Sequence, residues 1–231
     1  MGWLVDVVAW FRNPQSWQGP NGVPQRLLEH VGLSAAALGI ACALSIPVAL
    51  WLGHVHRGGA LAVGVSNIGR AVPTFAVLVL LVLAPEPFGL STLSILTALV
   101  LFAIPPILTN TYIGVREVDP AAVDAARGMG MNGPQVLAKV ELPLATGLLM
   151  DGVRLAAVQV VATATIAALV AGGGLGMIIT DGYGRQNQAE IIGGSLCVVL
   201  LALSVEGGMA LLQRRADPLR TVRERSRAAA V

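Results

Sequence analysis

Long apolar runs separated by short polar segments dominate the chain from about residue 31 onward. The first run, Val31 to Leu52, carries no charge and is long enough to cross a bilayer core, which takes about 20 apolar residues. Four similar runs follow, at 60–83, 93–112, 148–171 and 191–212. The pattern therefore predicts an all-α, polytopic membrane helical bundle with five transmembrane helices.

The segments outside these runs divide the chain into three parts. Residues 1–30 hold three of the four tryptophans among polar residues and prolines, which is typical of a membrane interface. Residues 31–212 form the predicted transmembrane domain, and they include a long polar loop at 113–146. Residues 213–231 form a basic tail.

Composition supports lipid as the solvent for most of the surface. Hydrophobic residues make up 55% of the chain and charged residues only 12%, and the mean hydropathy is +0.74. A soluble domain carries about 25% charged residues. Cys42 and Cys197 both fall inside apolar runs without metal-ligand spacing. We therefore expect no metal, no cofactor and no nucleic-acid partner.

The distribution of basic residues predicts the orientation. With the tail inside, the cytoplasmic side holds Arg57, the basic residues of the 113–146 loop and six arginines after residue 213. The outside holds only Arg12, Arg26 and Arg185. Because basic residues concentrate on the cytoplasmic side, we expect the N-terminus outside and the C-terminus inside the membrane.

The long loop contains the segment DPAAVDAARGMGMNGPQVLAKVELPLA. Its spacing resembles the EAA loop of binding-protein-dependent ABC permeases, with Asp in place of Glu and Val in place of Ile. The matching positions are Asp124, Ala125, Ala126, Gly130, Val140, Leu142 and Pro143.

The resemblance implies a type I ABC importer permease fold in a bacterial plasma membrane and a coupling role for these residues. It also implies several partners: two ATP-hydrolysing subunits, a second permease (identical or paralogous) and an extracytoplasmic substrate-binding protein. We expect two short helices separated by Gly130, which permits a left-handed turn. Ala125 and Ala126 would present a small surface to a groove on the ATPase, and Pro143 would reset the chain before the fourth span.

The glycine-rich segments do not indicate nucleotide binding by this chain. Gly128, Gly130 and Gly133 satisfy G-x-G-x-x-G, but a helix-forming stretch precedes them and Pro134 follows. The run at 172–176 lacks the Lys-Ser/Thr of a P-loop. The chain is therefore expected not to be an enzyme, and ATP hydrolysis is assigned to another subunit.

Three stretches resemble the osmoprotectant branch of the family, which handles glycine betaine, choline and carnitine: RAVPTFAVLVLL at 70–81, PPILTNTYIGVREVDP at 105–120 and GGGLG at 172–176. The GGLG run is shared with methionine and other amino-acid permeases, so a permease of that type is the alternative.

A secondary transporter belongs to a different class, and we find no internal repeat that favours it. The few aromatic residues near the spans do not form a cage for a quaternary ammonium group.

Polar residues at membrane depth are the candidates for a translocation pathway. Arg70 lies within the interrupted second run, where a charge costs about 2.5–3.5 kcal/mol on insertion scales. Snorkelling of Arg70 and back-bonding of each Thr within its own helix are the alternatives. The candidates are Arg70, Pro73, Thr74, Asn110, Thr163 and Thr165.

Overall fold

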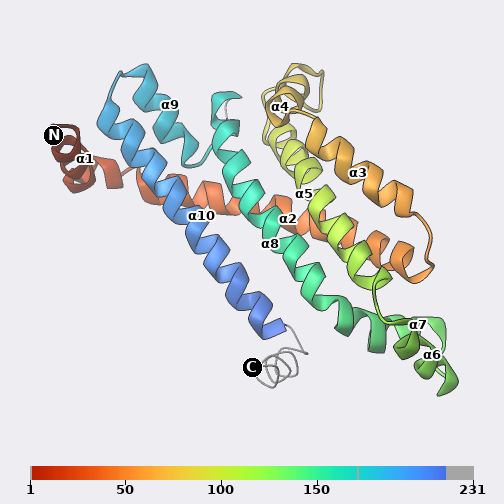
Figure 1. Cartoon of the computed structure of the whole chain (residues 1–231). Coiled ribbons are helices and arrows are strands. Elements are labelled where there is room, and N and C mark those ends of the chain that lie inside the picture. The colour runs from red at the N-terminus through yellow and green to blue at the C-terminus, as the bar shows by residue number, and fades with distance from the viewer. Residues whose placement is uncertain (1, 171, 217–231) are drawn as a thin grey trace. The chain divides into compact units, whose positions relative to one another are not determined.

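The computed structural model describes residues 2–170 and 172–216, and every regular element in those ranges is a helix (Figure 1). In chain order the elements are α1 (Gly2–Arg12), η1 (Pro14–Trp17), α2 (Val23–His54), α3 (Gly59–Ala71), α4 (Thr74–Leu83), α5 (Thr92–Arg116), α6 (Pro120–Gly128), α7 (Gly133–Val136), η2 (Leu137–Glu141), α8 (Leu142–Ala167), η3 (Ala168–Val170), α9 (Gly176–Gly184) and α10 (Gln188–Ala216).

The helices group into two compact units. Of the described residues, unit 1 contains those in the ranges 2–40, 71–103, 157–170 and 172–206, and unit 2 contains those in the ranges 41–70, 104–156 and 207–216. The longest helices, α2, α5, α8 and α10, each contribute residues to both units.

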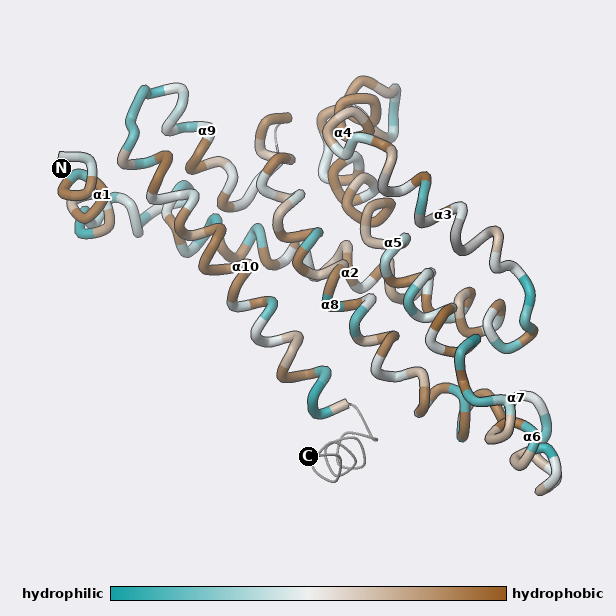
Figure 2. Tube along the Cα trace, viewed as in Figure 1, coloured by the Kyte–Doolittle hydropathy of each residue, from teal (hydrophilic) through white to brown (hydrophobic). Residues whose placement is uncertain are grey.

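Four helices in the described part of the chain are long and apolar enough to cross a membrane. They are Val23–His54, Thr92–Arg116, Gly133–Val170 and Gln188–Ala216. Three of them contain a whole predicted run, and Gly133–Val170 contains the 148–171 run as far as residue 170, since residue 171 lies outside the described residues. In Figure 2 hydrophobic residues recur along the length of α10 and in α4. The most apolar stretch of α10 buries none of its residues within the chain, as expected of a helix that faces lipid or another subunit.

The remaining predicted run, 60–83, is two helices and not one. Helix α3 ends at Ala71, and α4 begins at Thr74 with Pro73 as its N-cap. Proline has no N–H to donate, and its ring obstructs the preceding turn, so the helix stops there. Helix α4 has ten residues, too few to cross a bilayer core alone.

The predicted polar loop at 113–146 is mostly helical. Helix α5 extends to Arg116, and a continuous helical segment begins at Gly133 and runs through Val170. Pro143 does not break this segment, contrary to the expectation from the sequence. A π-helical turn, Leu137–Glu141, ends two residues before Pro143, and the N–H of Leu142 bonds to the carbonyl of Leu137. This wider turn accommodates the proline.

Within unit 2, glycines let two helices approach the proline pair of α5. A Cβ on Gly69 of α3 would lie 2.3 Å from Cγ of Pro105, and a Cβ on Gly152 of α8 would lie 2.7 Å from the carbonyl oxygen of Pro106. Small residues at such contacts are typical of packing between membrane helices.

In unit 1, a polar side chain replaces a hydrogen bond that one of these prolines cannot make. Pro106 cannot donate to the carbonyl of Phe102, and Nε2 of Gln159 lies 3.4 Å from that carbonyl oxygen. A carbonyl left free by proline in a membrane helix needs such a donor from elsewhere.

Candidate functional site

The segment that carries the EAA-like spacing begins at a capped helix. Asp119 is the N-cap of α6, and its side chain accepts a hydrogen bond of 2.9 Å from the N–H of Ala121. Pro120 occupies the first helical turn, where its missing N–H costs nothing. The sequence Asp-Pro thus fixes the start of this helix, and only three residues separate it from the end of α5.

Gly130 closes α6 in the way that its place in the sequence predicts. Its φ is +86°, in the left-handed region. The N–H of Met131 bonds to the carbonyl of Ala126 at 3.2 Å, and the N–H of Gly130 bonds to that of Arg127 at 2.9 Å. This pair of bonds is a Schellman motif with glycine at the C′ position. The expected helix–Gly–helix geometry is therefore present.

A capping box starts the next helix. The side chain of Asn132 accepts from the N–H of Gln135 at 3.0 Å, and the side chain of Gln135 accepts from the N–H of Asn132 at 2.9 Å. Reciprocal capping satisfies two donors that a helix start leaves open. Residues 119–141 therefore form a helical knob, fixed at both sides of Gly130 by local hydrogen bonds.

The knob has its own small apolar core, and Ala126 belongs to it. Ala126 is 1% exposed and packs in a cluster with Val118, Val123 and Val136. Val140 and Leu144 pack against the same cluster. The expectation that Ala126 faces a partner is therefore wrong, because its position on α6 points into the chain's own core. Its small size fits the close packing of two short helices.

The outer face of the knob is formed by other residues. Asp124, Ala125 and Arg127 are exposed, and Met129 is 72% exposed at the end of α6. Leu142 and Pro143 are half-buried at the start of α8. Of the seven positions with EAA-like spacing, Asp124, Ala125 and Gly130 are thus the ones on the open surface.

A buried pair that the sequence did not reveal attaches the knob to the end of α2. Oε2 of Glu141 lies 2.6 Å from Nδ1 of His54, and the Glu141 side chain is only 2% exposed. Glu141 is the last residue of the π-helical turn. The only signal in the sequence was an acidic residue inside the apolar stretch VELPL.

Two further contacts hold the same corner of unit 2 together. Nη1 of Arg116, at the end of α5, donates to the carbonyl of His56 at 3.0 Å. A Cβ on Gly53 would lie 2.8 Å from Cβ of Val115, so α2 and α5 are in close contact here. The ends of α2 and α5 are therefore packed together where the Glu141–His54 pair attaches the knob to α2.

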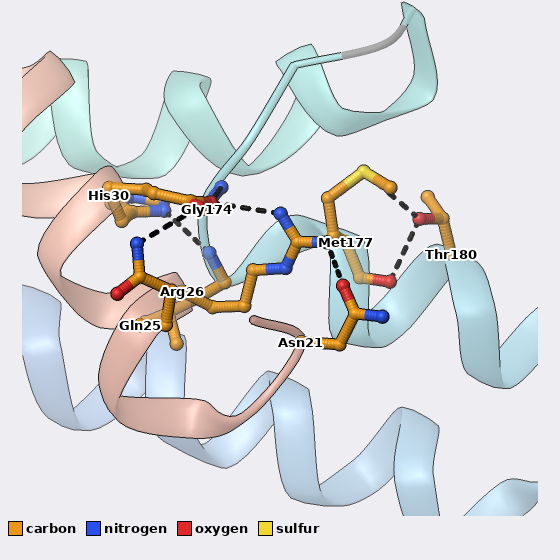
Figure 3. Close-up of polar contacts among 9 residues, drawn as sticks. Asn21, Gln25, Arg26, His30, Gly174, Met177 and Thr180 are labelled. Atoms are coloured by element: carbon orange, nitrogen blue, oxygen red, sulfur yellow. Dashed lines mark hydrogen bonds and ion pairs between the residues drawn. The ribbon is translucent and has the colours of Figure 1, made fainter. Parts of the chain in front are cut away.

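In unit 1, the glycine run at 172–176 is attached to the beginning of α2 (Figure 3). Oε2 of Glu29 accepts from the N–H of Gly174 at 3.0 Å and also pairs with Nη1 of Arg26 at 2.9 Å. Arg26 in turn donates to Oδ1 of Asn21 at 2.6 Å. The sequence had identified this run only as a family resemblance, and its physical role is this close approach.

His30 completes the attachment. It is 1% exposed, its Nδ1 accepts from the N–H of Leu175 at 3.3 Å, and its Nε2 lies 3.0 Å from the carbonyl oxygen of Val161. This arrangement fits the neutral ring with its proton on Nε2. Gly174 has φ +86°, and a Cβ there would lie 2.9 Å from Nδ1 of His30, so both the backbone and the space require glycine.

The candidate pathway residues are distributed over both units. Pro73, Thr74, Thr163 and Thr165 belong to unit 1, whereas Asn110 belongs to unit 2. Arg70 ends up in the last turn of α3 in unit 2, but its side chain lies outside the described residues. Helix α4, which begins at Thr74, packs against η3, the turn that follows α8.

Two of these polar side chains bond within their own helix. Oγ1 of Thr165 donates to the carbonyl of Val161 at 3.3 Å, and Nδ2 of Asn110 donates to that of Pro106 at 2.8 Å. For Thr165 this bond within its own helix is the alternative to a pathway role that the sequence left open. Both side chains are half-buried, so the bonds satisfy them at membrane depth.

Taken together, the long apolar helices and the capped knob between α5 and α8 define a polytopic helical membrane protein of the importer-permease type. The sequence profile of the family described as "Binding-protein-dependent transport system inner membrane component" matches residues 39–218. The chain belongs to this family, and it is thus a membrane permease subunit of an ABC importer.

Individual relatives agree with this assignment. The chain is 38% identical to the "Carnitine transport permease protein OpuCB" of Listeria monocytogenes over 85% of this chain and 88% of that protein. It is 30% identical to the "Choline transport system permease protein OpuBB" of Bacillus subtilis (strain 168), over 82% of this chain and 86% of that one. A solved structure of the MetNI methionine ABC transporter, in an inward-facing conformation, matches with a TM-score of 0.72 at 21% identity. That match covers 88% of this chain and 98% of the MetNI chain, and it shows the common fold.

Proposed function

We propose that this chain forms the translocation path for an osmoprotectant of the quaternary ammonium type, such as glycine betaine, choline or carnitine. The observation that carries the proposal is the 38% identity, over most of both chains, to a permease named for carnitine transport. Relatives named for choline and for glycine betaine support the same substrate class.

The energy for transport would come from two ATP-hydrolysing subunits, and the substrate would arrive on an extracytoplasmic binding protein. A second permease, identical or paralogous, would complete the path. The knob supports an ATPase contact, because its outer face is small and open at Asp124 and Ala125, with the exposed Met129 beside them. Exposed apolar side chains of this kind are common at protein contacts.

In this proposal the EAA-like residues divide into four roles. Asp124 and Ala125 contact the ATPase, and Gly130 sets the turn that presents them. Ala126 and Val140 hold the knob's internal core, while Leu142 and Pro143 lead from the knob into α8. The His54–Glu141 pair passes the movement of the knob to α2.

The orientation that fits this role has the knob in the cytoplasm, the N-terminus outside and five membrane crossings. Four crossings are the long helices, and α3 with α4 together make the remaining one. A broken crossing next to Arg70 would leave backbone carbonyls available to line a path. Arg70, Thr74, Asn110, Thr163 and Thr165 remain its proposed polar lining, and Pro73 provides the break in the helix.

Reconstitution tests the proposal. The permease is placed in proteoliposomes with its ATPase and binding protein, and uptake of radiolabelled glycine betaine, choline, carnitine and methionine is measured with and without ATP. We expect ATP-dependent uptake of at least one quaternary ammonium compound and none of methionine. Uptake of methionine alone would overturn the proposed substrate class and favour an amino-acid permease.

A further inference from the structure

Unit 1 contains a pocket that the proposed function does not use. It has a volume of ≈ 240 Å³ and lies among the end of α1, η1, the end of α9 and the start of α10. Its lining is mostly polar and includes Trp10, Asn13, Asn21, Asp181, Arg185 and Glu190. The volume is sufficient for a small organic molecule, and in the proposed orientation the pocket lies on the outer side of the membrane.

The charges in the pocket favour a cation. Nη1 of Arg185 lies 3.2 Å from Oε1 of Glu190, so these two charges neutralise each other. Asp181, on the last turns of α9, makes no side-chain hydrogen bond or ion pair with the part of the chain that the structure describes. Its carboxylate therefore gives the lining an excess negative charge, and a bound cation would compensate for it.

An aromatic wall favours an organic cation over a metal ion. A Cβ on Gly193 would lie 2.4 Å from Cε3 of Trp10, so the indole ring rests directly on α10. The ring also packs against a cluster of Val23, Leu175 and Ile178. The indole of Trp10, held in place in this way, lines the pocket, and aromatic rings attract weakly hydrated ammonium groups.

From this pocket we propose a weak binding site for a quaternary ammonium group, held between the carboxylate of Asp181 and the indole of Trp10. The ligand class rests on the proposed function, whereas the pocket, its charge and its aromatic wall are properties of the chain itself. Such a site would receive the substrate after its release from the binding protein and before it enters the path.

Binding is tested on the permease–ATPase complex in lipid nanodiscs without the binding protein, at constant ionic strength. Saturation-transfer NMR follows the methyl groups of tetramethylammonium and of glycine betaine. We expect both to bind, and we expect Asp181→Asn to weaken binding about fivefold, the effect of removing one charge contact of moderate strength. Arg185→Gln removes the cation that neutralises Glu190, so it should strengthen binding.

Two controls make the result specific. Asp6→Asn removes the same charge as Asp181→Asn, but Asp6 lies exposed on α1 and outside the pocket. This substitution should leave binding unchanged. Neopentyl alcohol has a similar shape without the charge and should not compete. Equal binding by the wild type and Asp181→Asn, or competition by the neutral compound, would overturn the site.

The two proposals fail separately. ATP-dependent uptake of glycine betaine together with binding that does not depend on Asp181 would refute the pocket and leave the proposed function intact. Tetramethylammonium binding that depends on Asp181, in a complex that imports no quaternary ammonium compound, would support the pocket and refute the proposed substrate.

Discussion

The carboxylate of Glu141 lies 2.6 Å from Nδ1 of His54 and is almost fully buried. The two residues are 87 positions apart in the sequence. One ends the π-helical turn before α8, and the other ends α2. A polar pair in this position specifies how the helical knob is attached, because a buried carboxylate has few alternative partners.

We predict that His54→Ala destabilises the permease more than Glu141→Gln does. Removing the imidazole leaves a buried carboxylate unpaired, which costs about 3 kcal/mol, whereas the amide of Gln keeps a hydrogen bond without the charge. The loss should appear as a lower thermal unfolding midpoint of the purified permease–ATPase complex. The exposed Glu117, changed to Gln, is the control. Equal midpoints for His54→Ala and the control would contradict a structural role for the pair.

The sequence predicted several features that depend on local chemistry. Two short helices separated by a left-handed turn at Gly130 were predicted, and the turn is present. The caps Asp119 and Asn132, which start these helices, were not predicted, although they also depend on local chemistry. Apolar runs predicted the long helices in the same way, since length and hydropathy need no tertiary information.

Features that depend on distant segments were not predictable. The burial of Ala126 requires knowing that α7 folds back on α6, and the partner of Glu141 is in another helix. Pro143 was expected to reset the chain before the fourth span, but the helical segment continues through it. The π-helical turn that accommodates the proline leaves no recognisable pattern in the sequence. The role of the glycine run at 172–176 could not be predicted either, because it depends on hydrogen bonds to Glu29 and His30 of α2.

Gly174 should not tolerate even a methyl group. We predict that Gly174→Ala lowers the unfolding midpoint, because a left-handed φ costs an L-residue about 1 kcal/mol or more and the new Cβ would meet His30. Gly184→Ala is the matched control, since nothing lies within 4 Å of its Cβ position and its φ is not positive. The measurement is thermal unfolding of the two variants in the same detergent. An unfolding midpoint for Gly174→Ala at or above that of the control would refute the requirement for glycine at position 174.

Membrane topology can be checked at both ends of the chain. With five crossings, a reporter fused at Gly22 and one fused after Arg220 should lie on opposite sides of the membrane. Alkaline phosphatase should be active only at the first site, and a fluorescent protein that folds only in the cytoplasm should be bright only at the second. Activity of the same reporter at both sites would show an even number of crossings and would reject the proposed orientation.

The turn at Gly130 should matter more for transport than for insertion. We predict that Gly130→Val greatly reduces ATP-dependent uptake, because a β-branched residue strongly disfavours the left-handed conformation and the knob loses its Schellman closure. Gly128→Val places the same side chain two residues earlier, where space is open and φ is not positive, and it should retain uptake. Uptake is compared at equal permease abundance in membranes. Equal losses in both variants would mean that bulk on α6, and not the turn, is what matters.

Ala125 and Ala126 are neighbours with opposite environments. Substitutions at these two positions therefore distinguish contact with a partner from folding of the knob. Ala125 is exposed, and Ala126 is 1% exposed beside Val136. We predict that Ala125→Phe leaves the unfolding midpoint of the isolated permease unchanged but reduces co-purification of the ATPase, because the ring would hold α6 away from its groove. Ala126→Asp should lower the midpoint itself, since it buries an unpaired charge in the knob's core. A permease with Ala125→Phe that retains its ATPase and its uptake would show that this face is not the docking surface. In that case the exposed Met129 at the end of α6 would be the next position to change.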